Sequence, residues 1–565
     1  MRPTSAILSC LPLALSFLIS CNKPAADRPD FDILLRGGRL ADGSGTPMVR
    51  ADVGVRDGLI AAVGDLSNKS AIKVIEAGGL VVAPGVIDIH THSDYSLLVD
   101  GGARSAVTQG VTTVILGEAT SAGPVNPADL PSMRIESPLY GVKADWSGLG
   151  EYLARLESAG TAVNVGSFAG SLTVRRFVMG ETNRAATPDE LNRMQAEVVR
   201  AMEEGALGVA SALLGSPLTT EELAVMARAA AEHGGIYATH IRDEGSRIFE
   251  ALDEAFEIGR RSGAAVDVLH LKVAERSLWG KMDSVLACFE RARAEGLQVT
   301  ANMYPYIAGQ NDLGSLIPPE GWEGGREKLL ERLRDPGWRG KFRASLYAGG
   351  RPDWYNHYTS SEGWKSMLVV STRNPRNSSL AGQTMDRVIA ERGGEPSDVL
   401  FDLLIEEDGS VPTIFFLMSE QDVAAAMRSP LVSFGSDGVA VRPDGVLGEG
   451  RPHPRWYGTF PRVLGHYVRE LGVLTFETAI LKMTWMNASK LGLHDRGLVV
   501  PGFAADLMVF DPERIIDRAD FSNPHRYSEG VMYVLVNGEL VIEAGEHTGA
   551  KPGHVLYGPG RNRPD

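Results

Sequence analysis

Residues 86–92 read Val-Ile-Asp-Ile-His-Thr-His, a stretch that indicates both a buried strand and a metal site. An apolar run typical of a buried strand ends in two histidines, His90 and His92. On a strand, side chains two residues apart point to the same side, so both imidazoles can reach one metal ion. The pattern indicates a strand whose C-terminal end carries metal ligands.

Three further strand-like runs end in side chains that can ligate metals. His240 ends the run Ile-Tyr-Ala-Thr-His, His270 ends Val-Asp-Val-Leu-His, and Asp437 follows Val-Ser-Phe-Gly-Ser. A single histidine at a strand end is more often structural, but a barrel gathers the C-terminal ends of its strands at one mouth. Because four of the twelve histidines and this aspartate occupy such ends in chain order, the sequence predicts a joint metal centre.

Strands and helices alternate through the middle of the chain. Thr187 and Glu190 form a capping box at the start of one expected helix, and residues 219–233 start in the same way. This alternation favours a parallel (β/α)8 barrel over an open sheet, although periodicity alone does not decide whether the sheet closes.

The two ends of the chain have a different pattern. Residues 31–83 and 491–565 are rich in short strands and turns, including a hairpin signal at Asn537-Gly538. We expect the ends to pair into one small β-sandwich, with the metal-dependent barrel between them at 84–490. A stretch at about 318–360, rich in Trp, Gly, Arg and Pro, is expected to be an insertion in the barrel.

The composition excludes several classes of function. The chain of 565 residues is 44% hydrophobic and 22% charged, which is ample for a folded core and argues against disorder. Its net charge of −15 repels phosphate backbones, so nucleic acid is not an expected partner. The cysteines are Cys10, Cys21 and Cys288. In an exported lipoprotein, Cys10 is removed with the signal peptide and Cys21 carries lipid, so only Cys288 remains and no disulfide framework is expected.

Residues 1–21 resemble a bacterial lipoprotein signal peptide. The apolar run 7–19 is too short to span a bilayer, and it ends near Leu-Ile-Ser-Cys, which is similar to a lipobox with Cys21 as the lipidated residue. Residues 22–30 are expected to tether the lipid to the folded body, and Asn22 favours the outer membrane of a Gram-negative bacterium. We expect an exported protein that faces the periplasm, held to the membrane by lipid alone. The alternative is an ordinary cleaved signal peptide that contains Cys21.

The whole chain also resembles the amidohydrolase superfamily and, within it, the D-aminoacylase (N-acyl-D-amino-acid deacylase) family. The resemblance rests on an ordered set of motifs: PGVIDIHTH at 84–92, QGVTTV at 109–114, YPY at 304–306, GSDG at 435–438 and HPRWYGTF at 453–460. It implies a distorted (β/α)8 TIM barrel, a small β-sandwich built from both chain ends, and one or two Zn²⁺ ions per chain.

The resemblance also implies which side chains bind metal: His90, His92 and Asp437 for one ion, and His240 and His270 for the other. The family places a cysteine in the turn after the second strand, and Ala119 stands at that position here. We expect the preceding residue, Glu118, to bridge the two ions, since a carboxylate can replace the usual bridging group. The alternative is a single tightly bound zinc, with Glu118 outside the ligand set.

The implied mechanism uses zinc to activate water and to polarise an amide carbonyl. Asp437 would accept the proton of the attacking water and return it to the departing amine. By resemblance, Lys272 and Tyr304 would hold the α-carboxylate of the substrate. Arg455 would be a further anion contact or part of a structural ion pair. Gln310 occupies a place where relatives commonly have serine, so the side-chain pocket is expected to differ.

These observations predict a zinc-dependent hydrolase of linear amides, acting on N-acyl-D-amino acids or on short peptides that contain D-residues. One alternative is a cyclic-amide hydrolase or a deaminase on the same scaffold, since fold does not fix substrate. Another is a binding lipoprotein without catalysis, for which Ala119 is the hint. The oligomeric state stays open.

Overall fold

The computed structural model describes residues 28–126, 141–351 and 353–561. The expected signal peptide, Cys21 and residues 22–27 of the expected tether lie outside these residues. Within the described part of the chain, no helix is both long enough and apolar enough to cross a membrane.

Parallel strands in the middle of the chain form the barrel. One sheet contains β6 (Val86–Asp88), β7 (Val111–Leu116) and β8 (Asn164–Ser167). The other contains β9 (Ala169–Gly170), β10 (Gly208–Ala212), β11 (Ile236–His240), β12 (Val266–Val268), β13 (Val299–Met303) and β17 (Val432–Phe434). Only Phe168 separates β8 from β9, so the two sheets join at that point. This arrangement is the distorted barrel that the sequence predicts.

The barrel closes between β17 and β6 without a regular ladder. The backbone N–H of Asp437 donates to the carbonyl of His90 at 2.9 Å, just beyond the ends of both strands. Deeper in the barrel, the side-chain amide of Asn487 donates to the carbonyls of Ile87 and Phe434, at 2.8 Å each. Asn487 lies on α19 (Trp485–Lys490) and is fully buried. A side chain from outside the barrel thus joins its first and last strands.

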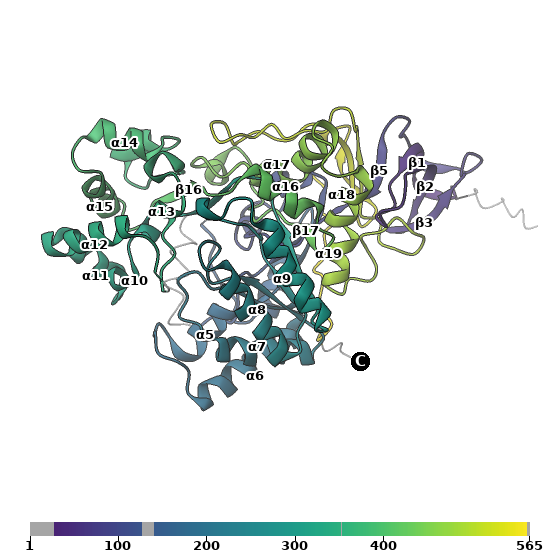
Figure 1. Cartoon of the computed structure of the whole chain (residues 1–565). Coiled ribbons are helices and arrows are strands. Elements are labelled where there is room, and N and C mark those ends of the chain that lie inside the picture. The colour runs from purple at the N-terminus through teal and green to yellow at the C-terminus, as the bar shows by residue number, and fades with distance from the viewer. Residues whose placement is uncertain (1–27, 127–140, 352, 562–565) are drawn as a thin grey trace, which may run out of the picture.

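Helices cover the outside of the barrel, and Figure 1 shows α5 to α9 gathered on one side. They are α5 (Ser171–Met179), α6 (Pro188–Glu204), α7 (Thr220–Glu232), α8 (Ile248–Ser262) and α9 (Met282–Ala294). Helices α6 and α7 begin with the capping boxes expected from sequence, at Thr187 and Thr219. Each capping box satisfies backbone N–H groups that the first turn would otherwise leave free.

The two chain ends share one nine-stranded sheet, at the right of Figure 1. Its N-terminal strands are β1 (Phe31–Leu40), β2 (Val49–Arg56), β3 (Leu59–Gly64), β4 (Ala71–Glu76) and β5 (Val81–Pro84). Its C-terminal strands are β18 (Leu507–Phe510), β19 (Val531–Val536), β20 (Glu539–Glu543) and β21 (Glu546–His547). β5 pairs with β18 in antiparallel fashion, and side chains such as Leu35 and Leu535 share one core.

A helical layer protrudes from the barrel between β13 and β17 (Figure 1). Its small antiparallel sheet contains β14 (Ala308–Asp312), β15 (Met367–Val369) and β16 (Pro412–Phe416). The expected insertion, 318–360, forms α10 (Pro319–Trp322), α11 (Gly325–Arg334), α12 (Pro336–Ala348) and α13 (His357–Ser360). The layer continues through α14 (Met385–Arg392) and α15 (Pro396–Glu406), which share its hydrophobic core. These later helices have ordinary amphipathic sequences, so composition alone does not separate them from barrel helices.

Candidate metal centre

Six side chains predicted to bind metal converge at the C-terminal mouth of the barrel. His90 and His92 follow β6, Glu118 follows β7, His240 ends β11, His270 follows β12, and Asp437 follows β17. They form two groups, each with ligand atoms within 4.8 Å of one another: His90, His92, Glu118 and Asp437 in the first, and Glu118, His240 and His270 in the second. Glu118 belongs to both groups.

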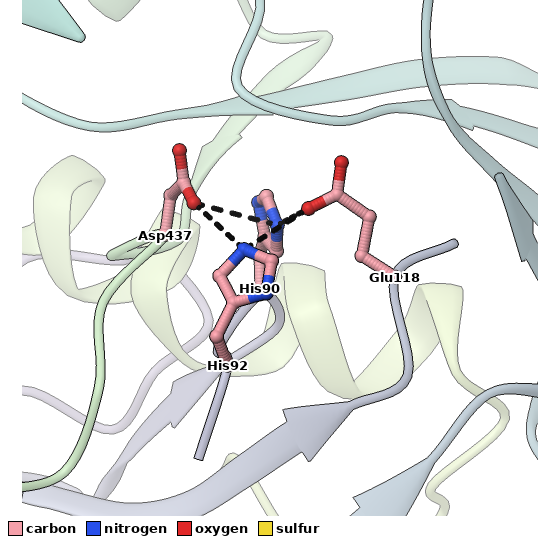
Figure 2. A group of neighbouring side chains, drawn as sticks. All are labelled: His90, His92, Glu118 and Asp437. Carbon is pink, nitrogen blue, oxygen red and sulfur yellow. Dashed lines mark hydrogen bonds and ion pairs between the residues drawn. The ribbon is translucent and has the colours of Figure 1, made fainter. Parts of the chain in front are cut away.

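The two carboxylate oxygens of Glu118 face different histidines. Oε2 lies 2.6 Å from Nε2 of His90 and 3.1 Å from Nε2 of His92. Dashed lines in Figure 2 mark both contacts. Oε1 lies 3.5 Å from Nδ1 of His240 and 3.6 Å from Nε2 of His270. This is the geometry of a carboxylate that can bridge two ions. Burial raises the pKa of Glu118, but the surrounding histidines outweigh burial and hold that pKa well below its usual range.

Asp437 stands opposite Glu118 across the first histidine pair (Figure 2). Its Oδ1 lies 3.1 Å from Nε2 of His92. Its Oδ2 lies 3.2 Å from Nη2 of Arg455, whose Nε also donates to the Asp437 carbonyl at 2.6 Å. Burial raises the pKa of Asp437, but Arg455 and His90 outweigh burial and keep the pKa well below its usual range. The carboxylate is therefore ionised, with Oδ1 directed at the histidines.

Three residues of the site have left-handed backbone angles. The φ angle is +54° at Ala119, +38° at His270 and +48° at Asp437. Such angles are strained for residues other than glycine and persist only where surrounding structure enforces them. The turns that present the ligand set are thus held in a fixed geometry. The turn at Ala119 has this left-handed backbone although its residue is alanine and not glycine.

The donor set fits zinc. Imidazole nitrogen and carboxylate oxygen are the ligands that zinc accepts, and each oxygen of Glu118 lies within 3.6 Å of two imidazole nitrogens. Burial lowers the pKa of His92 and of His240, but the neighbouring carboxylates outweigh burial and raise it, so the site favours positive charge at this place. A divalent cation between the two groups would supply that charge.

Comparisons with known proteins agree with this geometry. The amidohydrolase family matches residues 73–542, and these residues are most of the chain. The chain belongs to the amidohydrolase family. D-aminoacylase from Alcaligenes xylosoxydans xylosoxydans is 37% identical to this amidohydrolase over 535 residues, 94% of this chain and 98% of the relative.

Solved structures extend the match to three dimensions. A structure of D-aminoacylase, described for its binuclear metal centre, has a TM-score of 0.74 at 36% identity and covers 93% of this chain and 100% of its own. N-acyl-D-glutamate deacylase from Bordetella bronchiseptica, solved with zinc and a phosphonate inhibitor, has a TM-score of 0.77 at 30% identity. It covers 93% of this amidohydrolase and 99% of its own chain. The predicted family, fold class and zinc cofactor are confirmed.

Glu244 is a site residue that the sequence interpretation missed. Its carboxylate pairs with the ammonium of Lys272, and Oε1 lies 3.0 Å from Nδ1 of His270. The same carboxylate approaches His240, four residues earlier, at 3.6 Å. The four-residue spacing between His240 and Glu244 was the sequence signal for this contact. An acidic residue four positions after a ligand at a strand end can turn back toward that ligand. Lys272 contacts His270 and Glu244, and it also lines the cavity at the barrel mouth.

The substrate-binding residues predicted from the resemblance surround a cavity of about 500 Å³ at the barrel mouth. Lys272, Tyr304 and Arg455 all line it, and Gln310 stands on its rim beside β16. Arg455 forms the ion pair with Asp437 that was one of its two expected roles. Its Nη1 is buried and has no hydrogen-bond partner, so this nitrogen keeps its capacity to bind an anion.

Proposed function

We propose that this amidohydrolase cleaves the linear amide bond of N-acyl-D-amino acids. The observation that carries the proposal is the shared Glu118 carboxylate between two histidine groups, with an ionised Asp437 beside them at the floor of the cavity. D-aminoacylase and N-acyl-D-glutamate deacylase, to which the chain is similar along almost its whole length, support the choice of substrate class.

Zinc would be held by His90, His92, Asp437 and Glu118 on one side, and by His240, His270 and Glu118 on the other. When bound, it supplies the positive charge that makes water a nucleophile at neutral pH and polarises the scissile carbonyl. The chain's own residues supply proton transfer and orientation.

Asp437 is placed to move the proton. Arg455 engages Oδ2, which leaves Oδ1 directed at the histidines, where the attacking water would lie. Oδ1 accepts a proton as water adds to the carbonyl carbon, and it returns that proton to the nitrogen as the carbon–nitrogen bond breaks. An amine leaves poorly unless it is protonated, so this transfer belongs to the difficult part of the reaction.

Arg455 and Lys272 would orient the substrate by its α-carboxylate. Arg455 lines the cavity, and its unpartnered Nη1 can donate a charge-assisted hydrogen bond. The ammonium of Lys272 forms an ion pair with Glu244, so it attracts the substrate carboxylate less strongly. Tyr304, stacked under Arg455 at 4.8 Å, completes this wall.

The test of this function is a paired screen. N-acetyl derivatives of several D-amino acids and of their L-enantiomers are incubated with the zinc-loaded protein, and free amine is measured. We expect hydrolysis of D-derivatives with little turnover of the L-forms. Hydrolysis of hydantoins or aminopurines, with none of N-acetyl-D-amino acids, would contradict the proposal.

We also propose that the chain is exported as a lipoprotein anchored through Cys21, facing the periplasm from the outer membrane. The short apolar run at 7–19, the Leu-Ile-Ser-Cys sequence and Asn22 support this proposal. Metabolic labelling with a palmitate analogue should mark the wild type and leave Cys21→Ser unlabelled. Equal labelling of both chains, or cytoplasmic fractionation of the wild type, would contradict it.

A further inference from the structure

A second cavity of about 390 Å³ adjoins the catalytic cavity. The two share Leu214, Asn311 and His357 as lining residues, so the second opens from one wall of the first. It lies between the barrel loop that contains Leu214 and helices α10 and α13 of the inserted layer. The helical layer thus extends the catalytic cavity beyond the barrel mouth.

Aromatic rings form the walls of this second cavity. The indole N–H of Trp322 donates to the carbonyl of Gly314 at 3.2 Å, and that of Trp354 donates to the carbonyl of Ser315 at 3.0 Å. The hydroxyl of Tyr355 donates to the carbonyl of Ala274. Since these polar atoms are already bonded to the main chain, the rings present apolar surfaces to a ligand.

His357 forms the partition between the two cavities and is held in place. Its ring stacks on Phe415 with centroids 4.5 Å apart, and its Nδ1 lies 3.2 Å from Oγ of Ser315. Burial lowers the pKa of His357 to about 3, so the ring is neutral at neutral pH.

The charged groups that line the second cavity are carboxylates. They are Glu323 and Asp353, and Asp353 pairs with Arg351 at 3.1 Å. No Lys or Arg side chain is among the described residues of its lining. A carboxylate on the ligand would find no counter-charge here, and apolar groups would find ring faces.

The position of the cations fixes which part of the substrate points this way. Lys272 and Arg455 line the catalytic cavity but not the second one. In an N-acyl amino acid, the α-carboxylate and the side chain lie on the nitrogen side of the amide, whereas the acyl chain extends from the carbonyl in the opposite direction. A carboxylate held by Arg455 and Lys272 stays in the catalytic cavity, and the acyl chain, at the other end of the amide, is the uncharged part left to enter the second cavity.

We propose that the second cavity is an acyl subsite that takes an uncharged, bulky acyl group, such as an arylalkanoyl chain, on the substrate. This rests on the proposed function and narrows it, because the preferred substrates become N-arylalkanoyl derivatives of D-amino acids in place of N-acetyl ones. Trp322 and Trp354 determine this preference.

The test compares acyl groups on one D-amino acid. The N-acetyl, N-(4-phenylbutanoyl) and N-glutaryl derivatives of D-methionine are assayed with the zinc-loaded wild type. We expect kcat/KM to be about tenfold or more higher for phenylbutanoyl than for acetyl, because a buried ring gains contact area, and lowest for glutaryl, which brings a carboxylate.

Substitutions in the subsite should change only that preference. Trp322→Ala should reduce kcat/KM by a larger factor for the phenylbutanoyl derivative than for the acetyl derivative. Trp354→Phe keeps an aromatic ring and is the variant to use if Trp354→Ala does not fold. It should retain most of the preference for the phenylbutanoyl derivative. Trp364→Ala in the same helical layer is the matched control, since Trp364 packs on Tyr358 and does not line the cavity.

Each outcome decides the inference. The subsite is overturned if kcat/KM is equal for the acetyl and phenylbutanoyl derivatives, or if it is higher for the glutaryl derivative. It is also overturned if the loss of kcat/KM in Trp322→Ala depends on the side chain of the D-amino acid and not on the acyl group. Each of these results leaves the proposed function standing. Wild-type inactivity toward every acyl derivative would overturn the proposed function as well.

Discussion

Glu244 Oε1 lies 3.0 Å from Nδ1 of His270, on the side of the imidazole away from Glu118. The ammonium of Lys272 contacts the same Nδ1 at 2.6 Å, so Glu244 and Lys272 together hold this ring with its Nε2 toward Glu118. The same carboxylate neutralises the ammonium of Lys272, which would otherwise repel a nearby cation. Glu244 thus positions a predicted ligand without belonging to either ligand group.

Glu244→Gln should weaken metal binding at His240 and His270. Glutamine lacks the charge that offsets Lys272, and loss of such an orienting carboxylate typically costs 10- to 100-fold in metal affinity. Competition with a chromophoric chelator measures the change. Glu254→Gln is the matched control, because Glu254 pairs with Arg242 on the barrel exterior. Equal affinities for both variants would show that Glu244 does not orient the ligand.

Glu118→Ala should lower the zinc content of the purified protein from two ions toward one per chain, because the variant removes the ligand common to both groups. Elemental analysis after exhaustive dialysis measures the stoichiometry. Two ions retained per chain would place the bridge elsewhere, and one ion in both wild type and variant would favour a mononuclear enzyme.

Asp437→Asn should keep the fold and lower kcat by about 10²- to 10⁴-fold, the usual contribution of a positioned acid–base group. Steady-state kinetics on an N-acyl-D-amino acid, with zinc content measured in parallel, separates lost proton transfer from lost metal. Asp52→Asn is the control, since Asp52 is buried in the terminal sheet and accepts from the backbone of Gly37 and Leu66. Near-normal kcat in metal-loaded Asp437→Asn would remove Asp437 from the proton-transfer role.

Asn487→Leu should destabilise the protein and loosen the metal centre together. Two strand carbonyls lose their donor, which costs about 1–3 kcal/mol of unfolding free energy when buried groups are left unpaired. The same strands carry His90, His92 and Asp437, so zinc affinity should fall as well. Asn377→Leu removes a buried amide in the helical layer and should lower stability without affecting zinc. If zinc affinity falls equally in both variants, the Asn487 bridge has no special role.

Lys482 should make stability depend on pH. Burial lowers its pKa to about 7, whereas an unfolded lysine titrates near 10.5. Between these values the unfolded chain binds a proton that the folded chain does not, so the free energy of unfolding should rise with pH. Urea denaturation of the wild type and of Lys482→Met at pH 7, 8 and 9 measures the difference. Parallel pH profiles for the two proteins would show that Lys482 stays charged.

Much of the fold could be predicted because it depends on near neighbours. The capping boxes at Thr187 and Thr219 and the strand ends at His240 and His270 are patterns within a few residues, and the structure has each of them in place. The extent of the helical layer was not predictable, since α14 and α15 have the amphipathic pattern of any barrel helix and only their shared core assigns them to it.

Local patterns in the sequence indicate which side chains stand at the strand ends, including Glu118, because strand and turn positions follow from local periodicity. How those side chains meet is a property of the folded chain. His92 and Asp437 are 345 residues apart, Glu244 turns back onto two histidines, and Asn487 closes the barrel from another helix. Such contacts join residues that are far apart in the sequence. They depend on how the chain packs in three dimensions, and no local pattern of residues encodes them.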